Sequence, residues 1–166
     1  FFLHIVQNLK IFVGIYNTEL DRYRKQKNIR SRANPLPDLV RQGDVIELPF
    51  WIWGENEPRE RLFASVKSEG NVNLIYKREI IVNLNFSIGR SPLENLRNMK
   101  RIKDAGLRIR PRAIINTMYA RMFVSDLFVH GIGGAKYDLI TDEIIKKFFK
   151  VEPPGYAAIS ATLHLP

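Results

Sequence analysis

The order of elements between residues 126 and 166 constrains the fold more than any other feature of the chain. The apolar run "LFVH" leads into glycines, a helical apolar pattern covers 137–149, and "YAAISATLHL" is rich in strand-forming residues. Strand, glycine segment, helix and strand are the parts of a right-handed crossover, whose two strands lie parallel in one sheet. The order therefore predicts the α/β class, with a Rossmann-like parallel or mixed sheet and flanking helices.

The first third of the chain predicts a long helix and then strands. Apolar residues recur at spacings of three and four over residues 1–29, which is typical of one continuous helix. "VIELPFWIW" at 45–53 predicts a buried strand, and its Pro49 indicates an edge position or a bulge. Two or three short strands follow up to residue 86, joined at residues 68–71 by a hairpin connection, and we expect a small β-hairpin insertion there.

Local signals also place two helices in the second half. Ser91 is a capping residue, Pro92 occupies the first helical position, and Glu94 completes a capping box. Gly106 is a natural C-terminal residue, so a helix is expected over about 92–105. A second helix is expected from near Pro111, ending before the strand that enters the glycines.

The bulk composition suits one globular domain over residues 1–166, with 45% hydrophobic and 26% charged residues. Because the chain begins inside an apolar pattern without a methionine, we expect an internal piece of a longer protein. Cysteine is absent, which excludes disulfides, protein thiolate chemistry and Cys-based zinc sites. No apolar run approaches the roughly 18 residues of a membrane span, so no membrane partner is expected. The absence of cysteine suits a reducing compartment, and a cytoplasmic location is expected.

The main candidate for a functional site is "FVHGIGGAKYD", residues 128–138. Glycines at a strand end let a backbone approach a ligand, and the following helix N-terminus offers free N–H groups to an anion. His130 would act as acid, base or oxyanion donor. The substrate-binding residues would be Gly131, Gly133, Gly134, Lys136, Tyr137 and Asp138. The alternative that the glycines only make a tight turn stays open.

Two further segments are candidates for the same site. Trp51 and Trp53 share one strand face. They are either core residues beside a charged hairpin or, with Glu55, an aromatic, acidic rim beside the glycine loop. Alternate arginines at 108, 110 and 112 would grip a carboxylate or phosphate, and Arg110 is the one we expect in the site. Three scattered histidines leave no metal-ligand pair at the usual spacing. No nucleotide motif is present, so the sequence names no cofactor.

The runs "RIRPRAII", "LFVHGIGGAKYD" and "GYAAISATLHLP" together resemble the bacillithiol-biosynthesis enzymes proposed to add cysteine to a glucosamine–malate precursor. The matching pieces are Arg110-Pro111, Gly133-Gly134 and Ser160-Ala161-Thr162-Leu163. "VIELPFWIWGEN" is similar to a strand of that family that ends in tryptophan and is followed by acidic residues. The resemblance implies a Rossmann-like core, a small-molecule cleft at the glycine segment, ligase-like carbon–nitrogen bond formation, and a coiled coil beyond residue 166.

The residues leave more than one function open. The leading hypothesis is a ligase-like or transferase-like protein that binds a small anionic metabolite at the glycine segment. The net charge of +9 also permits a nucleic-acid-associated basic module, because basic residues gather at 22–32 and 97–112. A third hypothesis is a non-catalytic scaffold. The sequence does not indicate an oligomeric state.

Overall fold

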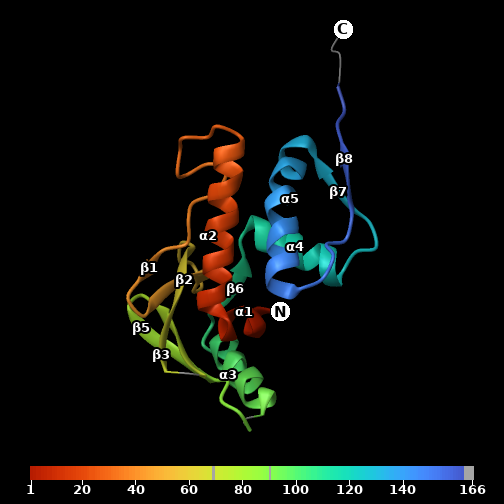
Figure 1. Ribbon diagram of the computed structural model, residues 1–166. Helices are drawn as coiled ribbons and strands as arrows, with labels where there is room; N and C mark the ends of the chain where they lie inside the picture. Colours follow the sequence, from red (N-terminus) through yellow and green to blue (C-terminus); the bar gives the residue numbers. More distant parts are fainter. Residues whose placement is uncertain (69, 90, 163–166) are drawn as a thin grey trace. The chain divides into compact units, whose positions relative to one another are not determined.

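The computed structural model describes residues 1–68, 70–89 and 91–162 (Figure 1). The chain forms two compact units, each made of two stretches of sequence. Unit 1 comprises Phe1–Gly14 and Asp38–Arg112, and unit 2 comprises Ile15–Pro37 and Ala113–Pro166. Each unit is therefore described by itself.

The N-terminal residues form two consecutive helices where one was predicted. α1 spans Phe2–Gln7 and α2 spans Leu9–Gln26. The interruption is Asn8, whose side-chain Nδ2 donates to the His4 carbonyl at 3.0 Å, so the asparagine itself satisfies the end of α1. The predicted apolar stripe is confirmed as the buried side of these helices, with the following residues buried: Ile5, Val6, Leu9, Phe12, Val13, Tyr16, Leu20 and Tyr23.

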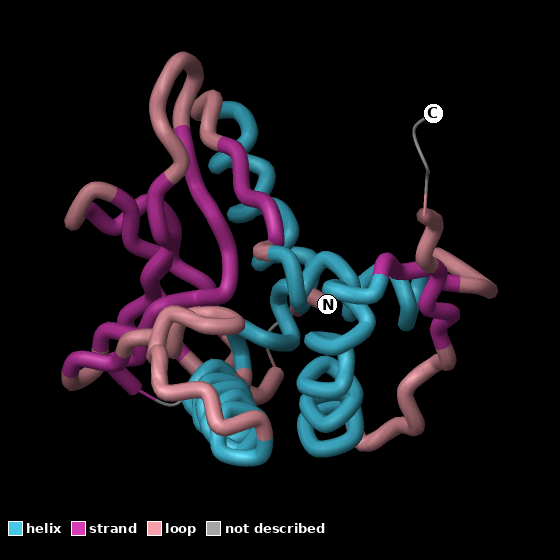
Figure 2. Tube along the Cα trace, turned by 90° about the horizontal axis from the view of Figure 1, so that it is seen from above, coloured by secondary structure: helices cyan, strands magenta, loops and turns pink. Residues whose placement is uncertain are grey.

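Unit 1 is built on a six-stranded sheet whose described pairings are all antiparallel (Figures 1 and 2). Its strands are β1 (Arg41–Gln42), β2 (Val45–Trp53), β3 (Glu60–Ser68), β4 (Asn71–Tyr76), β5 (Glu79–Asn85) and β6 (Arg108–Pro111). Strands β1 to β5 lie in chain order, and β6 also pairs with β2. The predicted Rossmann-like sheet is therefore wrong, and the presumed hairpin insertion is the main sheet.

Tight turns explain why this sheet is antiparallel. Lys77 and Arg78 both have positive φ, at 50° and 68°, and they join the paired residues Tyr76 and Glu79 as a two-residue hairpin. Such a short connection allows only antiparallel neighbours, since parallel strands need a long crossover. A Lys-Arg pair is not a usual signal for this turn. In the predicted connection at 68–71, Glu69 lies outside the described residues.

Strand β2 lies inside the sheet and has two distinct faces. Its register against β3 shifts between Glu47 and Trp51, which confirms the bulge predicted at Pro49. One face buries Ile46, Leu48, Phe50 and Ile52 in the core of unit 1. Trp51 and Trp53 lie on the opposite face and are half-buried.

Helix α3, Pro92–Asp104, confirms the prediction from its capping signals. Ser91 Oγ accepts a hydrogen bond from the Leu93 N–H at 3.3 Å, and Pro92 is the first helical residue. Gly106 follows the helix with a φ of +73°, a conformation that glycine adopts without steric cost. Asn95 of α3 is buried and bonds the backbone of Asn85, which attaches the helix to the end of β5.

In the C-terminal half of the chain, unit 2 contains the predicted crossover. Its elements after α2 are α4 (Ala113–Phe123), β7 (Phe128–Gly131), α5 (Ile132–Ile144), the π-helix η1 (Ile145–Phe149) and β8 (Tyr156–Ile159). β7 and β8 pair in parallel with α5 between them along the chain, as predicted. This pair is a separate two-stranded sheet and does not extend the large one. The end of the predicted last strand, residues 163–166, lies outside the described residues.

The glycine segment is not a loop. Strand β7 ends at Gly131, which is also the N-cap of α5, and the helix begins at Ile132. Gly133 and Gly134 therefore lie in the first turn of α5. The sequence suggested a loop because glycine is unfavourable inside helices by roughly 1 kcal/mol. At position 134 glycine is needed because a Cβ would clash with the His130 ring.

Candidate functional site

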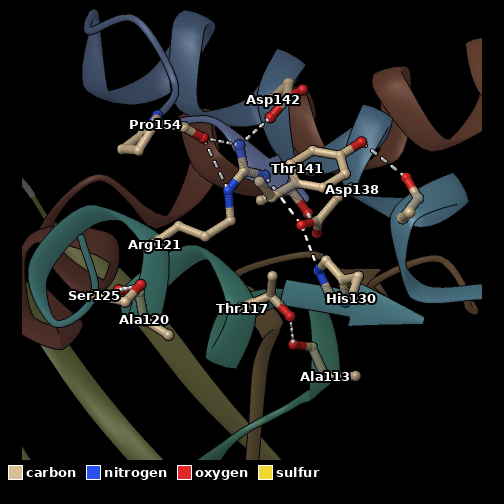
Figure 3. A network of polar contacts seen from close by, with 12 residues as sticks. Ala113, Thr117, Ala120, Arg121, Ser125, His130, Asp138, Thr141, Asp142 and Pro154 are labelled. Carbon is tan, nitrogen blue, oxygen red and sulfur yellow. Dashed lines mark hydrogen bonds and ion pairs between the residues drawn. The ribbon is translucent and has the colours of Figure 1, made fainter. Parts of the chain in front are cut away.

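The direct passage from β7 into α5 brings His130 and Asp138 together in unit 2 (Figure 3). His130 Nε2 lies 2.6 Å from Asp138 Oδ2. The Asp138 side chain is 3% exposed and the His130 side chain 14% exposed, so the contact is shielded from water. Two residues that the sequence marked as candidates thus form one hydrogen-bonded dyad.

The Asp138 carboxylate is held from two further sides. Arg121 Nη1 donates to Oδ2 at 3.1 Å, and Thr141 Oγ1 donates to Oδ1 at 2.9 Å. Because the ionised carboxylate only accepts hydrogen bonds, His130 must donate from Nε2. In the neutral imidazole the lone pair then lies on Nδ1, which is therefore the nitrogen left for proton exchange.

Arg121 of α4 connects this dyad to the rest of unit 2. It is buried and pairs with Asp138 and, at 2.7 Å, with Asp142 Oδ1. Its Nε donates to the Pro154 carbonyl at 3.1 Å, its Nη2 donates to the same oxygen, and its guanidinium lies 4.6 Å from the centre of the Tyr156 ring. One side chain therefore joins α4, α5 and the segment that enters β8 (Figure 3).

Aromatic rings fix the plane of the histidine. The Phe128 and Tyr156 rings meet the imidazole edge-on, with centroid separations of 4.7 and 5.6 Å. The Tyr156 hydroxyl donates to the Ala135 carbonyl at 2.9 Å, which ties β8 to the first turns of α5. Burial, followed by the nearby Asp142 and Asp138 carboxylates, raises the pKa of Tyr156. The phenol therefore remains a neutral hydrogen-bond donor at neutral pH.

Gly134 leaves the space that the imidazole needs. A Cβ at this position would lie 2.4 Å from His130 Nδ1, well inside van der Waals contact. A Cβ on Gly131 or Gly133 would meet no atom within 4 Å. Gly131 also has no side chain to cap the helix, and among the residues that the structure describes no side chain caps the first N–H groups of α5.

The remaining candidates in this segment lie on the surface. Lys136 and Tyr137 are exposed, and the Tyr137 ring packs edge-on against Tyr23 of α2 at 6.5 Å. The structure thus gathers His130, the glycines and Asp138, whereas Lys136 and Tyr137 belong to the outer side of α5.

Trp53, Glu55 and Arg110 belong to unit 1. Trp53 pairs across the sheet with Arg108, and Arg59 lies over its ring at 5.1 Å. Glu55 and Arg110 line a cavity of about 450 Å³ together with residues of α3 and β6. Glu55 and Arg110 therefore share this cavity, whereas Trp53 does not line it, and all three belong to a different unit from His130.

Sequence reasoning missed Arg121, Thr141, Asp142 and Tyr156. A signal for Arg121 was present, because it follows the buried Ile114 and Met118 at helical spacing. A charged residue on an apolar stripe must find a buried partner. The sequence could not predict its hydrogen-bond partners, because they lie 17 to 33 residues further along the chain.

Comparisons with known proteins give no relative from which to assign a function. No family model matches the chain, no curated protein matches it, and no solved structure matches it. The resemblance to bacillithiol-biosynthesis enzymes therefore stays a prediction. Within the described residues, no three histidines or carboxylates are grouped as metal ligands, and no helix has the length and apolarity to cross a membrane.

Proposed function

We propose that unit 2 binds a small anionic metabolite at the start of α5 and that His130 exchanges a proton with it. The observation that carries the proposal is the position of His130 Nδ1, which faces the glycine turn while Nε2 is fixed by Asp138. The uncapped N–H groups of the first turn would hold the negative charge of the ligand. The Asp138 carboxylate would stabilise the imidazolium that forms when Nδ1 takes up a proton.

The reaction class that fits this arrangement is group transfer to an amine, as in a ligase or transferase. The co-substrate would be an activated acyl compound, such as an acyl phosphate. The amine nitrogen bonds the acyl carbon as the bond from that carbon to the phosphate oxygen breaks, the phosphate leaves, and His130 Nδ1 would accept the proton that the amine loses. Bacillithiol-type thiol biosynthesis is one such reaction. It enters the proposal only through the sequence resemblance, and the geometry at His130 supports the broader class.

The proposal is tested by ligand-induced thermal stabilisation of the 166-residue chain. The probes are inorganic phosphate, malate, an amino sugar phosphate and nucleotides. Two variants are compared with the unaltered chain. His130→Gln removes the basic nitrogen, and Gly133→Ala places a methyl group in space that is empty in the fold but would be filled by the ligand.

We expect at least one anionic probe to raise the melting temperature and both variants to lose that response. Gly155→Ala is the matched control, because its Cβ also meets nothing within 4 Å and it lies in the same unit. This control should keep the response. If Gly133→Ala binds the probe as tightly as the control does, the start of α5 is only a structural junction.

A further inference from the structure

The outer face of the large sheet in unit 1 carries tryptophans between arginines. We name the set Trp51, Trp53, Arg59, Arg61, Arg108 and Arg110 the Trp–Arg face. Trp51 lies opposite Arg61 on β3 and opposite Arg110 on β6, and Trp53 lies opposite Arg108. Directly opposed residues of antiparallel strands point to the same side, so these side chains share one surface.

This surface is solvent-accessible and strongly positive. Both tryptophans are half-buried, and Arg59, Arg61, Arg108 and Arg110 are exposed. Arg59, Arg108 and Arg110 make no ion pair with any residue in the part of the chain that the structure describes. Arg61 shares the buried Glu47 with Arg112, so one carboxylate serves two arginines.

Cation–π contacts preorganise the indole rings. Arg112 lies 4.4 Å from the centre of the Trp51 ring and is anchored by Glu47 Oε1 at 2.7 Å. Arg59 lies over Trp53 at 5.1 Å but comes from an exposed turn, so it is able to move aside or to clamp a planar group against the ring. Trp51 is therefore held by an anchored arginine, and Trp53 is the ring that a planar group would reach when Arg59 moves aside.

The positive surface continues from the strands to α3. The cavity of about 450 Å³ beside β6 is lined by Lys103 of α3 together with Arg108 and Arg110, against one carboxylate, Glu55. Further exposed cations follow on α3, at Arg97, Lys100 and Arg101. A polyanion bound at the tryptophans could therefore place its next negative groups beside the cations of β6 and α3.

From this arrangement we infer that the Trp–Arg face binds single-stranded nucleic acid. Non-specific binders of single strands combine a positive track for the backbone with aromatic side chains on which bases stack. Alternate residues of a strand lie about 7 Å apart, which spaces the two indoles for neighbouring unstacked bases. A duplex fits less well, because its major groove admits a helix or a two-stranded ribbon and not a broad sheet face. This function is independent of the site at His130, since all its residues belong to unit 1.

Intrinsic fluorescence tests this inference directly, because Trp51 and Trp53 are the only two tryptophans of the chain. The probe is a twelve-nucleotide oligo-dT, titrated into the full chain between about 50 and 200 mM salt. We expect the oligonucleotide to quench the emission and the affinity to fall steeply as salt rises. Absence of quenching at the lowest salt overturns the inference.

Two charge variants separate the Trp–Arg face from general electrostatic attraction. Arg108→Ser/Arg110→Ser should weaken binding at least tenfold and reduce the salt slope by about 1.4, since each phosphate contact on a single strand contributes about 0.7. Lys27→Ser/Arg30→Ser removes the same charge from exposed positions of unit 2 and should change the affinity less than twofold. Equal losses in the two double variants contradict the inference.

A third variant tests stacking. Trp53→Leu should weaken binding about tenfold, while Trp51 continues to report on the complex. Circular dichroism confirms that each variant keeps its fold. If duplex DNA or anionic lipid vesicles quench the tryptophans as strongly as oligo-dT does, the face recognises another class of polyanion and the inference is wrong.

Discussion

At the residue scale, buried polar side chains determine the local structure in several places that the composition did not predict. Arg24 is buried, although it lies among the basic residues that gather at 22–32. Its guanidinium donates to the carbonyls of Arg32, Asn34 and Leu36 and so holds the segment after α2. Arg121 acts in the same way in the second half of unit 2. Both arginines show that a charged residue in a basic or apolar run is able to organise backbone far along the chain.

The adjacent glycines of α5 provide a matched test at this scale. Gly134→Ala forces the His130 ring away from Asp138, because the new Cβ would lie 2.4 Å from Nδ1. Loss of a charge-assisted hydrogen bond outweighs the gain in helix propensity, so the free energy of unfolding should fall by about 1–2 kcal/mol. Gly133→Ala gains only the propensity and should be equally or more stable, by up to about 1 kcal/mol. Urea unfolding measures both, and equal behaviour of the two variants would contradict this packing.

At the element scale, one carboxylate fastens the loop after β2 to the turn between β4 and β5. Glu57 accepts hydrogen bonds from the Tyr76 hydroxyl and from Lys77 Nζ, both at 2.5 Å, and from the Gly54 N–H at 3.3 Å. The hydrogen bonds from Lys77 and Tyr76 lower the pKa of Glu57 below its ordinary value of 4.5. The charged form is therefore the one that the folded state prefers.

These hydrogen bonds of Glu57, which we call the Glu57 clamp, make the free energy of unfolding of unit 1 depend on pH. A carboxyl whose pKa is lowered by folding stabilises the protein above its unfolded pKa, and the stabilisation is lost as the pH falls through the folded value. We expect the free energy of unfolding to fall less between neutral pH and about pH 3 in Glu57→Gln than in the unaltered chain. Glu55→Gln removes a neighbouring carboxylate that bonds neither Tyr76 nor Lys77, and it should leave the fall unchanged. Identical pH profiles for all three proteins would rule the clamp out.

The elements also show where sequence patterns suffice. Ser91, Pro92 and Gly106 predicted α3 because capping is a local effect, written within a few residues of each helix end. The β7–α5–β8 crossover was predicted because a strand, helix and strand in this order leave parallel pairing as the usual result. The large sheet was misjudged because strand pairing depends on turns, and the Lys77–Arg78 turn carries no glycine, asparagine or proline to mark it.

At the scale of the whole molecule, α2 is the element that both units share. Its residues up to Gly14 belong to unit 1 and those from Ile15 belong to unit 2. Length and composition predicted one globular domain, and the apolar stripe of the first helices continues through this boundary. The candidate residues were predicted as one site, although His130 and Trp53 belong to different units.

A proline at the boundary tests whether the continuity of α2 stabilises both units. Gly14 is exposed, and an added side-chain carbon would meet nothing within 4 Å, so Gly14→Pro acts on the backbone of α2 alone. Removing a helical hydrogen bond should cost about 3 kcal/mol or more. Hydrogen exchange should accelerate in β2 of unit 1 and in α5 of unit 2. Acceleration confined to one unit would show that the other does not depend on the continuity of α2, and Gly14→Ala serves as the space-matched control.

Nitrogen NMR of the His130 imidazole tests the proposed role of this residue most directly. We expect Nε2 to carry the proton shared with Asp138, and we expect Nδ1 to change its chemical shift when an anionic ligand such as phosphate or malate is added. In Gly133→Ala that change should disappear, while Nε2 remains bonded. A proton on Nδ1 in the free protein, or an Nδ1 signal that no anionic probe moves, would contradict the claim that this histidine is the ligand-facing group of unit 2.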